Sequence, residues 1–166
     1  MRALVTVASR HNATLEIGEV IAGTVREHGI ECDLIVPEDL TSVADYDVVI
    51  IGSAIYTGRW LPEARELVER LTDELQTKTV WLFSSGLADA PAKGSNRPAE
   101  TQERMTATGA VGHRHFSGRL DLNVLNFAER AIIAAARGKQ GDRRDMDAVR
   151  EWARSIVAQV QQTAGA

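Results

Sequence analysis

Short runs of apolar residues alternate along this chain with segments in which apolar residues recur every three or four positions. A run of about four to eight apolar, often β-branched residues is typical of a strand that is buried on both faces of a sheet. Five segments have this pattern and are predicted to be strands, at residues 4–7, 32–36, 47–52, 79–84 and 113–120.

The segments between these runs have helical periodicity. Ile17, Ile21 and Val25 share one face of a helix that ends at His28-Gly29, since glycine adopts the left-handed backbone of a helix end. Pro62 suits the first turn of a second helix, in which Leu67, Val68 and Leu71 form the apolar stripe. Further helices are predicted at about residues 99–107, 124–137 and 146–162.

Alternating strands and helices indicate right-handed crossovers and an α/β fold. We predict a doubly wound, five-stranded parallel sheet of order 2-1-3-4-5 with helices on both faces. Ligands bind such sheets beyond the carboxyl ends of the strands, where the strand order reverses. The loops that begin at Ala8, Ser53 and Ser85 are therefore the predicted site of function.

Composition narrows the class of protein. The 166 residues suit one domain, 1–166, because domains usually contain about 100–200 residues. A net charge of −4 does not indicate a nucleic-acid partner, and no apolar run approaches the ~18 residues that span a membrane. The single cysteine, Cys32, excludes an intrachain disulfide and favours a cytoplasmic location.

The first loop has the chemistry of an anion site. It contains the polar residues Ser9, Arg10, His11, Asn12 and Thr14 and leads directly into a helix. Unpaired N–H groups at a helix start bind phosphate well, although Ser9 and Thr14 could equally be ordinary helix caps. Asn12 tolerates a left-handed turn, which would bring the backbone close to a phosphate.

The three loops read ASRHNAT, GSAIYTGRW and SSG, and two later segments read HFSGRLD and GDRRDMDAVREWA. Together these motifs resemble the flavodoxin superfamily. The branch that they resemble most is that of the bacterial quinone-dependent protoporphyrinogen oxidases. The resemblance implies a flavodoxin-like fold and FMN as the cofactor.

The resemblance also implies which residues bind FMN. The phosphate would be held by Ser9, Arg10, His11, Asn12, Ala13 and Thr14. The isoalloxazine would be bordered by Ala54, Ile55, Tyr56, Thr57 and Gly58. Its other edge and the ribityl chain would contact Ser84, Ser85, Gly86, Leu87 and Ala88.

Other residues leave alternatives open. Trp60 could face the flavin or pack in the fold, and Cys32 is expected to be inert core. His113 and His115 share a strand face but lack a third ligand nearby, so no metal is expected. A mildly basic mouth for a carboxylate-bearing substrate is predicted from Arg59, Lys93, Arg97 and Arg104, with residues 87–119 as a wall.

These features favour an FMN-dependent oxidoreductase over an electron carrier. The substrate would be a porphyrinogen or another reduced organic compound, and a quinone would be the electron acceptor. The sequence identifies no proton-transferring residue, and it is compatible with a homodimer and with a peripheral membrane contact. The alternatives are a flavodoxin-type carrier between protein partners and a regulatory protein that has lost FMN.

Overall fold

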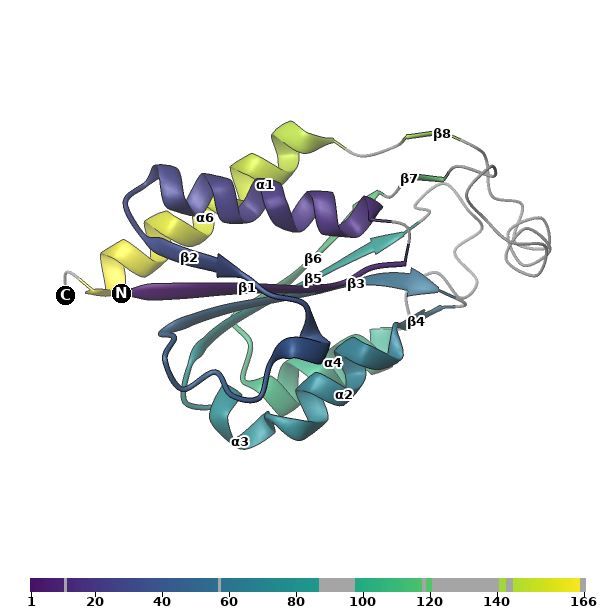
Figure 1. Ribbon diagram of the computed structural model, residues 1–166, viewed down its shortest axis with the longest axis horizontal. Coiled ribbons are helices and arrows are strands. Elements are labelled where there is room, and N and C mark those ends of the chain that lie inside the picture. Colours follow the sequence, from purple (N-terminus) through teal and green to yellow (C-terminus); the bar gives the residue numbers. More distant parts are fainter. Residues whose placement is uncertain are drawn as a thin grey trace.

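The computed structural model describes residues 1–10, 12–56, 58–86, 98–117, 119–120, 141–142 and 145–164. At its centre five parallel strands lie in the order β2-β1-β3-β5-β6 (Figure 1). This confirms the predicted order, because β4 is a short hairpin strand beside β3 that the prediction did not number. The strands are β1 Arg2–Ala8, β2 Glu31–Leu34, β3 Val48–Tyr56, β4 Arg59–Trp60, β5 Thr79–Gly86 and β6 Gly112–Ser117.

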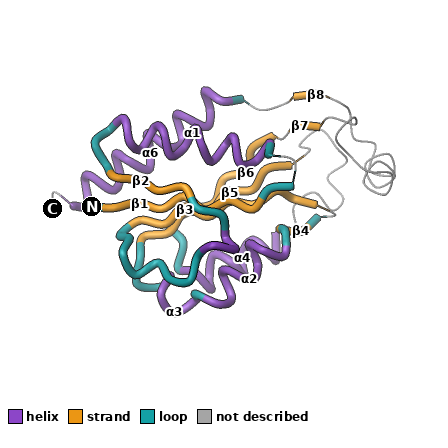
Figure 2. The backbone as a smooth tube through the Cα atoms, in the orientation of Figure 1, coloured by secondary structure: helices purple, strands orange, loops and turns teal. Residues whose placement is uncertain are grey.

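Helices cover both faces of the sheet (Figure 2). α1 (Ala13–Glu27) and α6 (Met146–Ala164) pack together on one face. The opposite face carries α2 (Pro62–Arg70), α3 (Thr72–Leu75) and α4 (Pro98–Thr108), and the 3-10 helix η1 (Pro37–Asp39) lies beside α2. In the described part of the chain, none of the helices has both the length and the apolar content that crossing a membrane requires.

Each face of the sheet buries its own apolar cluster. Val5 and Ile50 point toward α1 and α6, whereas Leu4 and Ile51 point toward α2. Successive residues of a strand face opposite sides. The strands therefore read as continuous apolar runs because both sides are covered.

Gly52 permits a close contact inside the α1/α6 cluster. It lies opposite Phe83 in the ladder between β3 and β5, and the Phe83 ring covers the space where a side chain would be. That ring also makes edge contacts with Phe116 and Trp152, at centroid distances of 6.1 and 6.0 Å. The ring is therefore enclosed by aromatic neighbours.

Several predicted boundaries were wrong. β3 was predicted to end at Gly52 but continues to Tyr56, because the chain then turns back and pairs with it as β4. β5 was predicted to end at Ser84 but extends to Gly86. β2 was predicted to reach Val36 but ends at Leu34, which is the last residue of β2 that pairs with β1.

The end of the chain differs further from the prediction. The segment 113–120 is divided into β6 and β7 (Arg119–Leu120), and β7 pairs with β8 (Gly141–Asp142) in a separate two-stranded sheet. Strands of two residues have no periodicity by which a sequence could reveal them. The predicted helix at 124–137 lies outside the described residues.

Candidate functional site

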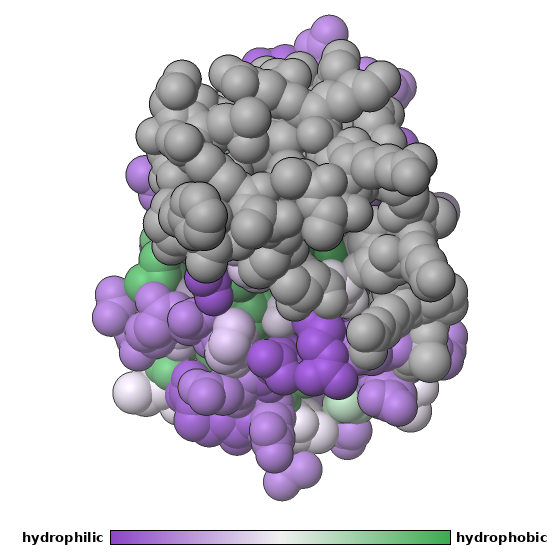
Figure 3. Space-filling model, turned by 90° about the vertical axis from the view of Figure 1, so that its right-hand side faces the viewer, coloured by the Kyte–Doolittle hydropathy of each residue, from purple (hydrophilic) through white to green (hydrophobic). Residues whose placement is uncertain are grey.

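The reversal of strand order falls between β1 and β3. The chain leaves β1 into α1 on one face of the sheet and leaves β3 toward α2 on the other. The carboxyl ends of these strands and of β5 meet at one edge, which Figure 3 views directly. Where described residues are visible there, hydrophilic side chains surround a few hydrophobic ones.

The turn before α1 has the geometry of an anion site. Asn12 adopts the left-handed conformation predicted for it, with φ 63° and ψ −4°, and its side chain makes no capping hydrogen bond. None of the described residues accepts a hydrogen bond from the Thr14 or Leu15 N–H. The Thr14 side chain is buried at the same point. Donors at an uncapped helix start fit a phosphate well.

A cavity of about 160 Å³ lies beside this turn. Ser9 and Asn12 line it together with two carboxylates, those of Glu38 and Glu63. Negative charge there disfavours a phosphate inside the cavity itself. We therefore expect an anion bound at the start of α1 to lie outside this cavity.

The second predicted loop is a β-hairpin. Ala54, Ile55 and Tyr56 continue β3, and Gly58, with φ 79°, lies in the turn before β4. The Ser53 hydroxyl accepts a hydrogen bond from the Leu61 N–H at 2.9 Å, which ties the strand after the hairpin to β3. Leu61, the residue that follows β4, is therefore held against β3.

Three segments converge at this edge as the sequence predicted. The Arg10 guanidinium lies 4.7 Å from the centre of the Tyr56 ring and so links the first loop to the end of β3. Ala54 and Ser85 are partners in the β3–β5 ladder. Gly86 lies so close to Ile55 that a Cβ at position 86 would be 3.1 Å from the Ile55 Cβ.

Of the sixteen candidate cofactor residues, the structure describes all except His11, Thr57, Leu87 and Ala88. The role of all sixteen residues in binding the cofactor stays a prediction. Ala13 is the first residue of α1, and Ser84 is fully buried.

Trp60 packs inside the fold, which decides between the two roles that the sequence left open. Only 1% of the residue is exposed, and its indole Nε1–H donates to the Ser84 Oγ at 2.7 Å. The same oxygen lies 2.8 Å from the His113 Nε2. Arg104 from α4 covers the indole ring, with 4.3 Å between the guanidinium carbon and the ring centre.

The residues predicted to form a basic mouth are only partly described. Arg59 forms an ion pair with Glu100 at 3.2 Å, so its charge is largely compensated. Arg104 is half-buried against Trp60, while Lys93 and Arg97 lie outside the described residues.

The histidines of β6 are half-buried and face α4. Burial, together with the neighbouring Arg104 and His115, lowers the pKa of His113 to about 4. Burial also lowers the pKa of His115. Among the described residues, no three His, Cys, Asp or Glu side chains lie close enough to hold a metal ion. Cys32 is buried core as predicted, and burial raises its pKa to about 11.

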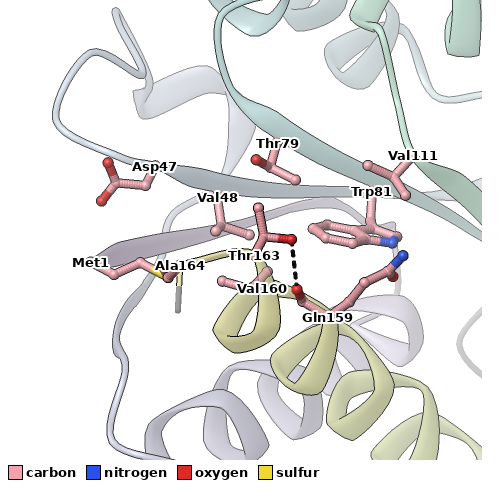
Figure 4. Close-up of a pocket in the computed structure, with 10 residues that line it drawn as sticks. All are labelled: Met1, Asp47, Val48, Thr79, Trp81, Val111, Gln159, Val160, Thr163 and Ala164. Carbon is pink, nitrogen blue, oxygen red and sulfur yellow. Dashed lines mark hydrogen bonds between the residues drawn. The ribbon is translucent and has the colours of Figure 1, made fainter. Parts of the chain in front are cut away.

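A second cavity lies at the opposite, amino end of the strands (Figure 4). Its volume is about 190 Å³, and Trp81 and Val48 form its sheet side. On the side formed by α6, the Thr163 hydroxyl donates a hydrogen bond to the Gln159 carbonyl at 3.0 Å. Met1 and Ala164 both line it, so the beginning of β1 and the end of α6 are neighbours.

Comparison with known families decides the assignment. The family model described as a flavodoxin domain matches residues 4–147. The chain belongs to the flavodoxin-domain family. Membership in this family indicates FMN as the cofactor, and the uncapped turn at Asn12 fits its phosphate. No match was found among curated proteins.

Solved structures agree on the fold. Rubredoxin oxygen:oxidoreductase from Desulfovibrio gigas is 16% identical with a TM-score of 0.64, and the match covers 99% of this chain but 37% of that protein. The chain thus spans little more than a third of that relative. The flavodoxin of Streptococcus pneumonia TIGR4 is 17% identical with a TM-score of 0.62, covering 96% of this chain and 99% of that one. Oxidised flavodoxin 1 from Bacillus cereus is 18% identical with a TM-score of 0.58, and the match covers 82% of this chain and 95% of that one.

Proposed function

We propose that this chain is an FMN-dependent oxidoreductase that takes hydride equivalents from a reduced organic substrate and passes electrons to a quinone. The observation that supports this most is the convergence of the uncapped start of α1 with the ends of β3 and β5. Bound FMN would supply the two-electron redox chemistry. The chain's own residues bind and orient it.

In this proposal each segment holds one part of the cofactor. The Thr14 hydroxyl and the first-turn N–H groups of α1 bind the phosphate, together with Ser9, Arg10, His11, Asn12 and Ala13. The ring is bordered by Tyr56, which the Arg10 guanidinium holds in place, and by Ala54, Ile55, Thr57 and Gly58. The other edge and the ribityl chain contact Ser84, Ser85, Gly86, Leu87 and Ala88.

A porphyrinogen is the substrate that the motifs favour, because they resemble the protoporphyrinogen oxidase branch. The likeness to flavodoxins supports a second candidate, an electron carrier between proteins. A substrate-oxidising enzyme and a carrier differ in how the reduced protein responds to a small acceptor.

Phosphate recognition is tested by titrating the apoprotein with FMN and with riboflavin, which lacks the phosphate. We expect Thr14→Ala to weaken FMN binding at least about tenfold. The substitution removes a hydrogen bond to a charged group, and such a bond contributes about 1.5–3 kcal/mol. Riboflavin affinity should change little. Thr24→Ala is the matched control, since Thr24 is also buried in α1 but donates to the Val20 carbonyl at 2.8 Å. Equal affinity of the wild type for FMN and riboflavin would contradict the phosphate site.

The choice between enzyme and carrier is tested with menadione, a soluble quinone. We expect the photoreduced protein to be reoxidised by menadione with saturation kinetics in stopped-flow absorbance. A reduced protein that ignores menadione but transfers single electrons to a small redox protein would favour the carrier.

A further inference from the structure

A cluster of polar side chains lies between the carboxyl ends of β5 and β6 and helix α4. It consists of Trp60, Ser84, Arg104, His113 and His115, and we call it the Arg104 cluster. Ser84 and His115 are ladder partners, so the cluster is built into the sheet. It lies outside the residues that the phosphate of FMN would contact.

The hydrogen bonds of the cluster are compatible with a neutral His113. The Ser84 Oγ accepts from the Trp60 indole, and its own proton can then be donated to the His113 Nε2. This arrangement satisfies all three groups if the imidazole is neutral and carries its proton on Nδ1. A pKa of about 4 agrees with a neutral ring near pH 7. In this tautomer His113 offers an N–H donor from Nδ1.

Arg104 is a half-buried cation that forms no ion pair within the described part of the chain, although the carboxylates of Glu100 and Glu103 lie near enough to act on its charge. No carboxylate of a described residue forms an ion pair with it, and the nearby Glu100 is paired with Arg59 at 3.2 Å. Its Nε is buried and has no hydrogen-bond partner, and the same is true of the His115 Nδ1. Burying polar atoms without partners is unfavourable, and an arginine remains charged at any ordinary pH. Arg65 opposes the effect of these carboxylates, and burial lowers the pKa of the Arg104 guanidinium.

The orientation of Arg104 suits an oxyanion. Its guanidinium lies over the Trp60 ring at 4.3 Å, and Trp60 is held in turn by Ser84. A guanidinium that stacks on a ring keeps its in-plane N–H groups available, and this planar fork matches the two oxygens of a carboxylate.

We propose that the Arg104 cluster binds a carboxylate of the substrate, with Arg104 as the charged partner and His113 and His115 as additional hydrogen-bonding groups. The proposal rests on the proposed function, because it names the substrate class as an organic acid. His115 lies beside Gly86, with its Cε1 3.8 Å from where a Cβ of residue 86 would be. A carboxylate anchored here would hold the rest of the substrate near the end of β5, which is proposed to border the flavin.

The test uses benzoate as the probe on the FMN-loaded, oxidised protein, without turnover. Benzoate should shift the ring nitrogen resonances of His113 and His115 in long-range ¹H–¹⁵N spectra, whereas neutral benzamide should not. Arg104→Gln should weaken benzoate binding at least tenfold. Arg104→Lys keeps the charge but loses the planar pair of N–H donors, and it should weaken benzoate binding several-fold. Arg114→Gln is the matched control, because Arg114 is an exposed residue of β6 that lies over the Phe116 ring at 5.7 Å.

Unchanged histidine resonances, or equal benzoate affinity in wild type and both Arg104 variants, would overturn the proposal. Tighter binding of phenylphosphonate than of benzoate would overturn the choice of a carboxylate. FMN affinity is measured separately by flavin fluorescence, and the benzoate titration is repeated on apoprotein. A protein that binds benzoate but not FMN would refute the proposed function and leave this site standing.

Discussion

Replacing Gly52 with alanine tests how tightly the sheet is packed beneath the candidate site. A Cβ at this position would lie 2.0, 2.2 and 2.5 Å from three ring carbons of Phe83. Carbon atoms pack at about 3.5–4.0 Å, so the ring would have to move by more than about 1 Å. Phe116 and Trp152 lie against that ring and restrict such a movement.

Overpacking of this kind costs about 1–3 kcal/mol, and we expect Gly52→Ala to lie at the upper end. Gly23→Ala is the matched control, because Gly23 is inside α1 with nothing within 4 Å of the added carbon. Alanine stabilises a helix interior by about 0.5–1 kcal/mol relative to glycine, so the two substitutions should have opposite signs.

The assay is urea unfolding of the apoprotein, followed by far-UV circular dichroism, because bound FMN would add its own stabilisation. Adding Phe83→Leu should relieve part of the Gly52→Ala loss, so the two effects should not be additive. A free energy of unfolding for Gly52→Ala within about 0.5 kcal/mol of wild type would refute the packing argument.

Two further predictions concern the turn and the buried histidine. Asn12→Gly should keep or improve both stability and FMN affinity. Asn12→Ala should lower the free energy of unfolding in urea by about 1 kcal/mol, because φ is 63° and alanine disfavours left-handed backbone. If the alanine and glycine variants behave alike, the turn does not restrict residue 12. As pH falls from 6.5 to about 4, the unfolded chain takes up a proton that the folded His113 ring resists, so stability should fall by about 1 kcal/mol after allowance for solvent screening. His113→Gln should reduce that loss, and an unchanged loss in this variant would show that His113 is not its source.

The sheet could be predicted from the sequence because each parallel strand is a short apolar run buried on two faces. The left-handed turn at Asn12 was also predictable, since few residue types adopt it and the surrounding loop is polar. The convergence of the three loops followed from the topology alone.

The Arg104 cluster could not be predicted in this way. Trp60 and Ser84 are 24 positions apart, and Ser84 and His113 are 29 apart, so no local periodicity relates them. The hairpin of β3 and β4 was missed for a similar reason, because its register depends on the Ser53 hydroxyl and on a glycine turn. A polar network between distant segments becomes visible only when the strands are aligned.

Met1 and Ala164 lie close together, and this determines how the protein can be attached to a surface for electrochemistry. Both lie at the amino end of the strands, and the candidate site lies at the carboxyl end (Figure 1). A tether at either position would therefore attach the molecule to an electrode with its redox edge facing the solution. A short linker between the two positions would also give a circular permutant in which new ends could be opened elsewhere without disturbing that edge.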